Sequence, residues 1–214
     1  MENTIHIYNF LLRGGPLIWP IVLCSVAGVT IFLERFFYIG RLRKIDRSLI
    51  AGLAQLDHKS EKNIFAHLLS LVSGTPLERM IQDVATLPFW GRKGLETIFD
   101  YHIDATLSHA ARGLDMLATL ATIAPLLGLL GTVTGLIRAF MVIEKAGGQV
   151  NASSLAGGIW EAMLTTAVGL GVAIPLILAH KILLSRLRGL EDDLQRIAIT
   201  CMKHISFFRE NQAS

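Results

Sequence analysis

The residues best suited to do chemistry in this sequence are hydroxyl and small side chains that share one face of an apolar stretch. Gly128, Thr132, Gly135 and Ala139 recur at steps of four, three and four residues, which places them on one side of a helix. No formal charge occurs in residues 116–137. Small residues let helices approach closely, and a threonine hydroxyl can hydrogen-bond water or another polar group. This face therefore indicates either tight helix contact or one wall of a polar path.

A second charge-free stretch, residues 162–180, repeats the pattern with Thr165, Thr166 and Gly169, and Glu161 precedes it. On a helix Thr165 shares the face of Glu161, whereas Thr166 is rotated by roughly 100° more. Near the outer membrane surface a carboxylate reaches water at little cost, whereas a buried Glu161 could carry a proton. The residues alone leave open whether Glu161 is buried, and which of the two threonines faces a path.

Glycines and prolines in the same stretches are typical of helix contacts inside a membrane. Gly131 and Gly135 form a pair four residues apart, the spacing that brings two helix backbones together. Pro125 and Pro175 each lack an N–H, so a carbonyl one turn earlier must find another partner. We expect helix-packing roles for Gly128, Gly131, Gly135, Gly169, Pro125 and Pro175.

The sequence carries no pattern that indicates catalysis or metal binding. Its seven histidines form no His-Glu-x-x-His pair and no cluster with cysteine. The glycines at 128 and 131 are not followed by the lysine that a phosphate-binding P-loop requires, because Thr132 comes directly after Gly131. Cys24 and Cys201 fall in regions too different to pair. We expect no enzyme activity, no catalytic residue, no metal and no cofactor.

The composition indicates which elements position these residues. Of the 214 residues 52% are hydrophobic and 17% charged, whereas soluble domains carry roughly 25% charged residues. Residues 14–33, 116–137 and 162–180 are free of formal charge, and each is about long enough for a hydrocarbon core that needs ~20 residues of helix. The net charge of +3 is too small to indicate a nucleic-acid binder. The sequence therefore predicts an all-α integral membrane protein with three transmembrane helices.

Basic residues orient these spans, because short cytoplasmic flanks collect Lys and Arg. The N-terminal tail has only Arg13 and the loop between the second and third spans only Lys145. The flanks that follow the first and third spans contain Arg41, Arg43, Lys44, Arg47, Lys181, Arg186 and Arg188. We expect the N-terminus outside and the C-terminus in the cytoplasm.

Two apolar stripes continue beyond the second and third spans. One contains Leu183, Leu187, Leu190, Leu194, Ile197 and Cys201, and the other Leu95, Ile98, Phe99, Ile103, Leu107 and Ala110. Their heptad-like spacing predicts that helices two and three extend into the cytoplasm as long stalks. The expected organisation is an external tail (1–13), helix 1 (14–38), a cytoplasmic insert and stalk (39–112), helix 2 (113–142), an external loop (143–158), helix 3 (159–181) and a cytoplasmic helix (182–214).

Two motifs in these spans resemble a known family. Residues 124–135, Ala-Pro-Leu-Leu-Gly-Leu-Leu-Gly-Thr-Val-Thr-Gly, resemble the APxxGLxGTVxG segment of the ExbB/TolQ/MotA proton-channel family. Residues 158–170 resemble its partner motif GIxEALxxTAxGL, and Ala-Ile-Pro follows at 173–175. The resemblance is strong from about Asp115 to His180, and the short N-terminal tail is most like ExbB, with TolQ next.

The resemblance implies a function and a set of partners. It implies a homo-oligomeric ring, a pentamer, in the bacterial inner membrane, whose pore holds two single-span ExbD/TolR-like subunits. The partner's membrane aspartate binds and releases the proton, and a TonB-like protein passes the work to the outer membrane. The family's pore threonines map onto Thr132 and Thr166, and its glutamate maps onto Glu161. Thr165 occupies a position that is often Ala in the family, so Thr166 ranks first.

Other functions fit the same spans. A TolQ-like subunit would serve envelope maintenance instead of outer-membrane transport. A non-conducting scaffold or a transporter permease subunit would use the same small residues for helix contact alone. A genomic neighbour that encodes a single-span protein with a membrane aspartate would favour the proton channel, whereas a neighbouring ATPase would favour the permease.

Overall fold

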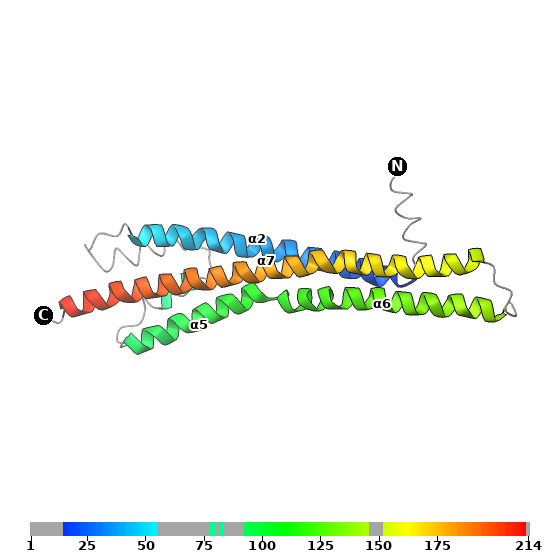
Figure 1. Ribbon diagram of the computed structural model, residues 1–214. Coiled ribbons are helices and arrows are strands. Elements are labelled where there is room, and N and C mark those ends of the chain that lie inside the picture. The colour runs from blue at the N-terminus through cyan, green and yellow to red at the C-terminus, as the bar shows by residue number, and fades with distance from the viewer. Residues whose placement is uncertain (1–14, 55–77, 80–81, 84–91, 146–151, 213–214) are drawn as a thin grey trace. The chain divides into compact units, whose positions relative to one another are not determined.

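The computed structural model describes residues 15–54, 78–79, 82–83, 92–145 and 152–212 (Figure 1). They form the long helices α2 (Ile18–Ala54), α5 (Arg92–Ala111), α6 (Leu114–Lys145) and α7 (Ala152–Gln212), and these ranges contain no strand. The all-α class predicted from the sequence is confirmed. The predicted external tail (1–13), much of the cytoplasmic insert and the centre of the outer loop lie outside the described residues.

Three helical segments are long and apolar enough to cross a membrane, namely Ile18–Arg43, Lys93–Lys145 and Leu155–Met202. The second and third contain the charge-free stretches 116–137 and 162–180, and the first contains the stretch 14–33 from Ile18 onward. The three predicted spans therefore correspond to helices of suitable length and composition. The exact limits of the spans, and the side of the membrane on which each end lies, stay predictions.

The chain divides into two compact units. The first comprises the described residues up to Leu33 together with Gly113–Ile182, and the second comprises those of Glu34–Arg112 and Leu183–Ser214. The first unit thus contains the start of α2, all of α6 and the first part of α7. The second contains α5, the rest of α2 and the rest of α7.

The core of the first unit is made mainly of small residues. The buried positions of α6 recur every three or four residues and are Leu114, Leu117, Ala121, Ala124, Gly128, Gly131, Gly135 and Ala139. On α7 the buried residues of this unit are Ala162, Leu164, Thr165, Gly169, Ala173, Leu176 and Ala179. The turn that precedes α2 is closed by the N–H of Ile18, which donates to the carbonyl of Gly15.

The core of the second unit is made mainly of large apolar side chains. Its buried members are Ile39, Leu42, Leu95, Phe99, Ile103, Ala110, Leu183, Leu190, Leu194, Ile197, Ala198 and Cys201. Most of both predicted stripes is therefore buried, whereas Leu187, Ile98 and Leu107 are half-buried. Thr106 is buried although the stripe did not include it. Its hydroxyl donates to the carbonyl of His102 over 2.8 Å, which satisfies the polar group inside its own helix.

The helices differ from the predicted stalks in two places. The stripe before the second span does not run on as one helix, because α5 ends at Ala111 and α6 begins at Leu114. Gly113 between them has a φ of 81°, a conformation that side chains with a Cβ rarely adopt, and it therefore ends the helix. In addition, α2 continues beyond the first span to Ala54, an extension that the sequence did not predict.

Candidate functional site

The site is built on the close approach of α6 and α7 within the first unit. A Cβ added to Gly169 would lie 2.8 Å from the carbonyl oxygen of Ala124 and 3.0 Å from the Cα of Gly128. A Cβ added to Gly128 would lie 3.1 Å from the Cα of Thr166. The two backbones are thus in direct contact, and only glycine leaves room for this approach at positions 128 and 169.

The same close contact continues along both helices. A Cβ on Gly131 would overlap the side chain of Thr165, and one on Gly135 would lie 2.8 Å from the Cβ of Ala162. Further along, a Cβ on Gly158 would lie 2.9 Å from the Cβ of Ala139. The glycines predicted to support helix contact at positions 128, 131, 135 and 169 all lie in this interface.

The hydroxyl of Thr166 joins the two helices. Its Oγ1 lies 2.8 Å from the carbonyl oxygen of Gly128, on the opposite helix. A carbonyl has no proton to give, so the hydroxyl must be the donor, and its oxygen retains lone pairs that can accept a hydrogen bond. Thr166 is half-buried. It therefore combines a fixed hydroxyl with partial access from outside the interface.

Thr165 is placed differently from its neighbour. Its exposed fraction is 1%, and its side chain packs against Gly131. Its Oγ1 donates to the carbonyl oxygen of Glu161, one turn earlier on α7, over 2.9 Å. The predicted shared face of Glu161 and Thr165 thus points into the α6–α7 interface. Of the two candidate threonines, Thr166 is the more accessible in the single chain.

Thr132, the candidate on α6, is half-buried. Its Oγ1 donates to the carbonyl oxygen of Leu129 in the same helix over 2.6 Å. Thr134 donates in the same way, to the carbonyl oxygens of Leu130 over 2.9 Å and Gly131 over 3.2 Å. As in Thr166, the hydroxyl proton of Thr132 is used in a hydrogen bond to a carbonyl, and the lone pairs of its oxygen can accept a further hydrogen bond.

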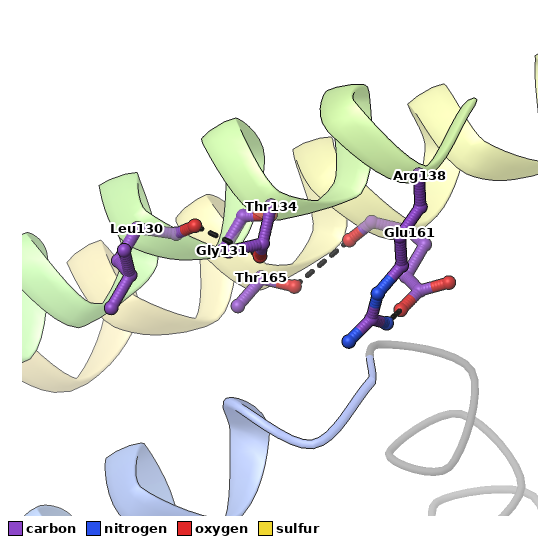
Figure 2. A network of polar contacts seen from close by, with 6 residues as sticks. All are labelled: Leu130, Gly131, Thr134, Arg138, Glu161 and Thr165. Carbon is purple, nitrogen blue, oxygen red and sulfur yellow. Dashed lines mark hydrogen bonds and ion pairs between the residues drawn. The ribbon is translucent and has the colours of Figure 1, made fainter. Parts of the chain in front are cut away.

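Glu161 makes an ion pair with Arg138 near the end of α6 (Figure 2). The Nη1 of Arg138 lies 3.2 Å from the Oε1 of Glu161. The exposed side-chain fractions are 54% for Arg138 and 31% for Glu161. In the single chain the side chain of Glu161 is thus partly exposed, and the guanidinium of Arg138 on α6 is its partner.

Arg138 was absent from the candidate residues taken from the sequence. A signal was nevertheless present, because Arg138 directly follows the charge-free stretch 116–137 and Glu161 directly precedes the stretch 162–180. Two helices joined by a short loop are antiparallel neighbours, so the end of one lies near the start of the next. Opposite charges at these two positions therefore predict a pair, which the sequence analysis treated only as limits of the spans.

The two prolines lie inside their helices. Pro125 is half-buried in α6, and Pro175 is exposed in α7. Each leaves one carbonyl of its helix without the usual intrahelical N–H partner. Among the residues that the structure describes, no group of three or more His, Cys, Asp or Glu side chains could hold a metal ion.

Comparison with known proteins adds a family and several relatives. The model of a family described as the MotA/TolQ/ExbB proton channel family matches residues 77–196, which is more than half of the chain. A Synechocystis sp. protein that bears the name ExbB-like 1 is 32% identical over 190 residues, which cover 86% of this chain and 73% of that protein.

Two further relatives come from other bacteria. The biopolymer transport protein exbB1 of Vibrio cholerae is 29% identical over 171 residues, which cover 79% of this chain and 75% of that protein. The Tol-Pal system protein TolQ of Haemophilus influenzae is 43% identical over 77 residues, which cover 36% of this chain and 33% of that protein. The similarity thus extends over most of the chain for the first two proteins and over about a third for TolQ.

Proposed function

The chain belongs to the MotA/TolQ/ExbB proton channel family, and on this premise we propose that it is the ExbB-type subunit of an inner-membrane motor complex. Together with an ExbD-like single-span partner it uses the proton-motive force to energise a TonB-dependent transport process at the outer membrane. Five copies form a ring around two partner helices. The N-terminus lies in the periplasm and the C-terminus in the cytoplasm.

One observation carries the proposal, namely that α6 and α7 meet at hydroxyl-bearing faces without a titratable group in mid-span. No formal charge occurs between Asp115 and Arg138, or between Glu161 and Lys181. A proton that crosses at this depth therefore needs a carboxyl group from another chain. A partner helix with one membrane aspartate supplies that group beside Thr132 and Thr166.

The direction of the hydroxyl hydrogen bonds defines what these threonines do. The hydroxyls of Thr132 and Thr166 donate to the carbonyl oxygens of Leu129 and Gly128, so their oxygens face any further partner as acceptors. An acceptor can receive the O–H of a protonated carboxyl group, whereas it offers nothing to an ionised one. The threonines therefore favour the neutral, protonated form of the partner's aspartate at mid-membrane.

A TolQ-like role in envelope maintenance is the second candidate. The observation that favours it is the higher local identity of 43% to the TolQ relative, although this holds over only 77 residues. The ExbB-named relatives match over 171 and 190 residues, which supports the ExbB-type role as the first choice. A non-conducting scaffold would share the close helix contacts but would not need the hydroxyls. In all these roles the chain has no enzyme activity of its own.

Replacing Thr166 with Val tests the proposed function. Valine is nearly isosteric but lacks the hydroxyl, so the ring should assemble while the acceptor beside the partner's aspartate is lost. We expect proton-dependent uptake in cells to fall by at least about tenfold, a loss that corresponds to about 1.4 kcal/mol. The measurement is energised uptake through a TonB-dependent receptor, with membrane levels determined in parallel.

Thr200→Val is the matched control for this experiment. Thr200 also donates its hydroxyl to a backbone carbonyl, but to that of Arg196 in its own helix over 2.8 Å, and it belongs to the second unit. This variant should retain normal uptake. Full uptake in Thr166→Val at normal membrane levels would remove Thr166 from the proton path and favour the scaffold.

A further inference from the structure

The ion pair between Arg138 and Glu161 lies where α6 and α7 meet the turn that precedes α2 in the first unit. A Cβ added to Gly15, in the turn before α2, would overlap the Oε1 of Glu161 and would lie 3.8 Å from the Nη1 of Arg138. Gly15 has a φ of 74°, so its backbone conformation also favours glycine. The Glu161 carboxylate is thus held between the guanidinium of α6 and the backbone of the turn before α2.

The backbones of α6 and α7 lie in close contact around the pair. Gly135 faces Ala162, and Ala139 faces Gly158, each at a distance that leaves no room for an added Cβ. Arg138 and Glu161 lie beside these contacts on the same two helices. The separation of the helices is therefore fixed by small residues, and the ion pair decides where the Glu161 side chain points.

We propose that Arg138 is the positioning residue for Glu161. It draws the Glu161 carboxylate toward Gly15 and fixes it in the first part of α7, while Thr165 and Thr166 lie about one turn further along the helix. Glu161 then lies at the end of the α6–α7 path as a carboxylate of defined position, so that a negative charge marks the entrance to the path. This inference rests on the proposed function, because the path is the one that Thr132 and Thr166 border.

A positioning role makes a specific prediction for charge removal. In Arg138→Gln the Glu161 carboxylate loses the Arg138 guanidinium and is free to adopt other rotamers. We expect energised uptake to fall by about fivefold, which corresponds to about 1 kcal/mol. Arg138→Lys keeps a cation within reach and should restore most of the uptake. Lys145→Gln removes a positive charge from an exposed position further along α6 and serves as the matched control.

A double-mutant cycle separates action through Glu161 from any other effect of Arg138. Glu161→Gln should lower uptake by a factor similar to that of Arg138→Gln, and Arg138→Gln should cause no further loss in the Glu161→Gln background. Losses that multiply in the double variant would show that Arg138 acts independently of Glu161 and would overturn the proposal. Unchanged uptake in Arg138→Gln would overturn it as well.

The exchange of the two charges distinguishes positioning from simple fastening. The variant Arg138→Glu/Glu161→Arg keeps an ion pair between α6 and α7 but moves the carboxylate to the other helix. We expect it to restore the thermal stability of the detergent-purified protein but not its uptake. Recovery of full uptake would mean that the pair only fastens the helices, and the positioning role would be wrong.

The stability measurement keeps this inference separate from the proposed function. The four proteins of the cycle should show coupling between Arg138 and Glu161 of about two- to fivefold in the ratio of folded to unfolded protein, since the pair is partly exposed. This coupling does not depend on proton transport. If the cycle shows coupling but the wild-type protein drives no proton-dependent uptake, the proposed function is refuted. If the wild-type protein is active but the cycle shows no coupling, the positioning role is refuted.

Discussion

The α6–α7 interface of the first unit and the core of the second unit use opposite kinds of side chain. Gly128, Gly135 and Gly169 bring backbones into contact in the first, whereas Phe99 and Leu194 fill the second with large apolar groups. In lipid, an apolar side chain gains nothing by leaving one hydrocarbon environment for another, so contact area between backbones decides helix association. In water, the burial of large apolar side chains is the main stabilising term.

The polar contacts differ between the two regions in the same way. In the first unit the hydroxyls of Thr132, Thr165 and Thr166 donate to backbone carbonyls. In the second unit charged side chains connect the helices: Arg43 pairs with Asp193 over 3.3 Å, and the guanidinium of Arg186 lies 3.6 Å from the ring centroid of Phe36. Among the described residues, the ion pair of the first unit is the one between Arg138 and Glu161 near the end of the span, whereas charged side chains connect the helices within the second.

Truncation of a large core residue should have the greatest effect in the second unit. Phe99 is 2% exposed, and Phe99→Ala should destabilise this unit by about 3–5 kcal/mol because it leaves a cavity. Tyr101, two residues later on α5, is 70% exposed, and Tyr101→Ala should cost much less. The measurement is the midpoint of thermal unfolding in detergent. Similar shifts for the two variants would contradict the view that buried large apolar side chains stabilise this unit.

The addition of a single methyl group should have the next largest effect, this time in the first unit. In Gly169→Ala the new Cβ meets the backbone of α6, and overpacking of this kind costs about 1–3 kcal/mol. Gly171 on the same helix has no atom within 4 Å of an added Cβ, so Gly171→Ala is the matched control. Both changes gain the same helix propensity. An equal melting temperature for the two variants would argue against backbone contact between α6 and α7.

Loss of the Arg43–Asp193 pair should have the smallest effect. The exposed side-chain fractions are 30% and 19%, so solvent screens the pair, and the coupling should be about 1 kcal/mol or less. Arg43→Gln, Asp193→Asn and the double variant form the cycle, with melting recorded at low and high salt. The coupling should decrease as salt rises. A coupling that is large and independent of salt would show that the second unit also depends on a desolvated charge pair.

Periodicity in the sequence predicted the long helical stripes and most of the second core, but not the break at Gly113 or the extension of α2 to Ala54. Leu183, Leu190, Leu194 and Ile197 follow the heptad-like spacing and are buried. The pattern did not predict the burial of Thr106, a polar side chain whose hydroxyl is hydrogen-bonded to a carbonyl within α5. Hydropathy ranks threonine as a surface residue, and it does not register a hydroxyl whose partner is a carbonyl of the preceding turn.

The candidate site was predicted in part. The face of Gly128 and Gly135 was evident from spacing, but the accessibility of Thr165 and Thr166 depends on how α7 is turned against α6. A helical wheel gives the angle between two residues and not the direction of the neighbouring helix. Arg138 and Gly15 were missed because their importance comes from contacts between distant segments of the chain.

The apolar side chains left on the surface of the first unit bear on how this protein is made. Leu126, Leu129, Leu178 and Ile174 are among the exposed large hydrophobic residues of α6 and α7, while the faces that meet consist largely of small residues. Contact between these helices would therefore hide little apolar surface from water. During biosynthesis the spans must first be inserted into the bilayer by their outward faces, and only then can glycine and threonine join them.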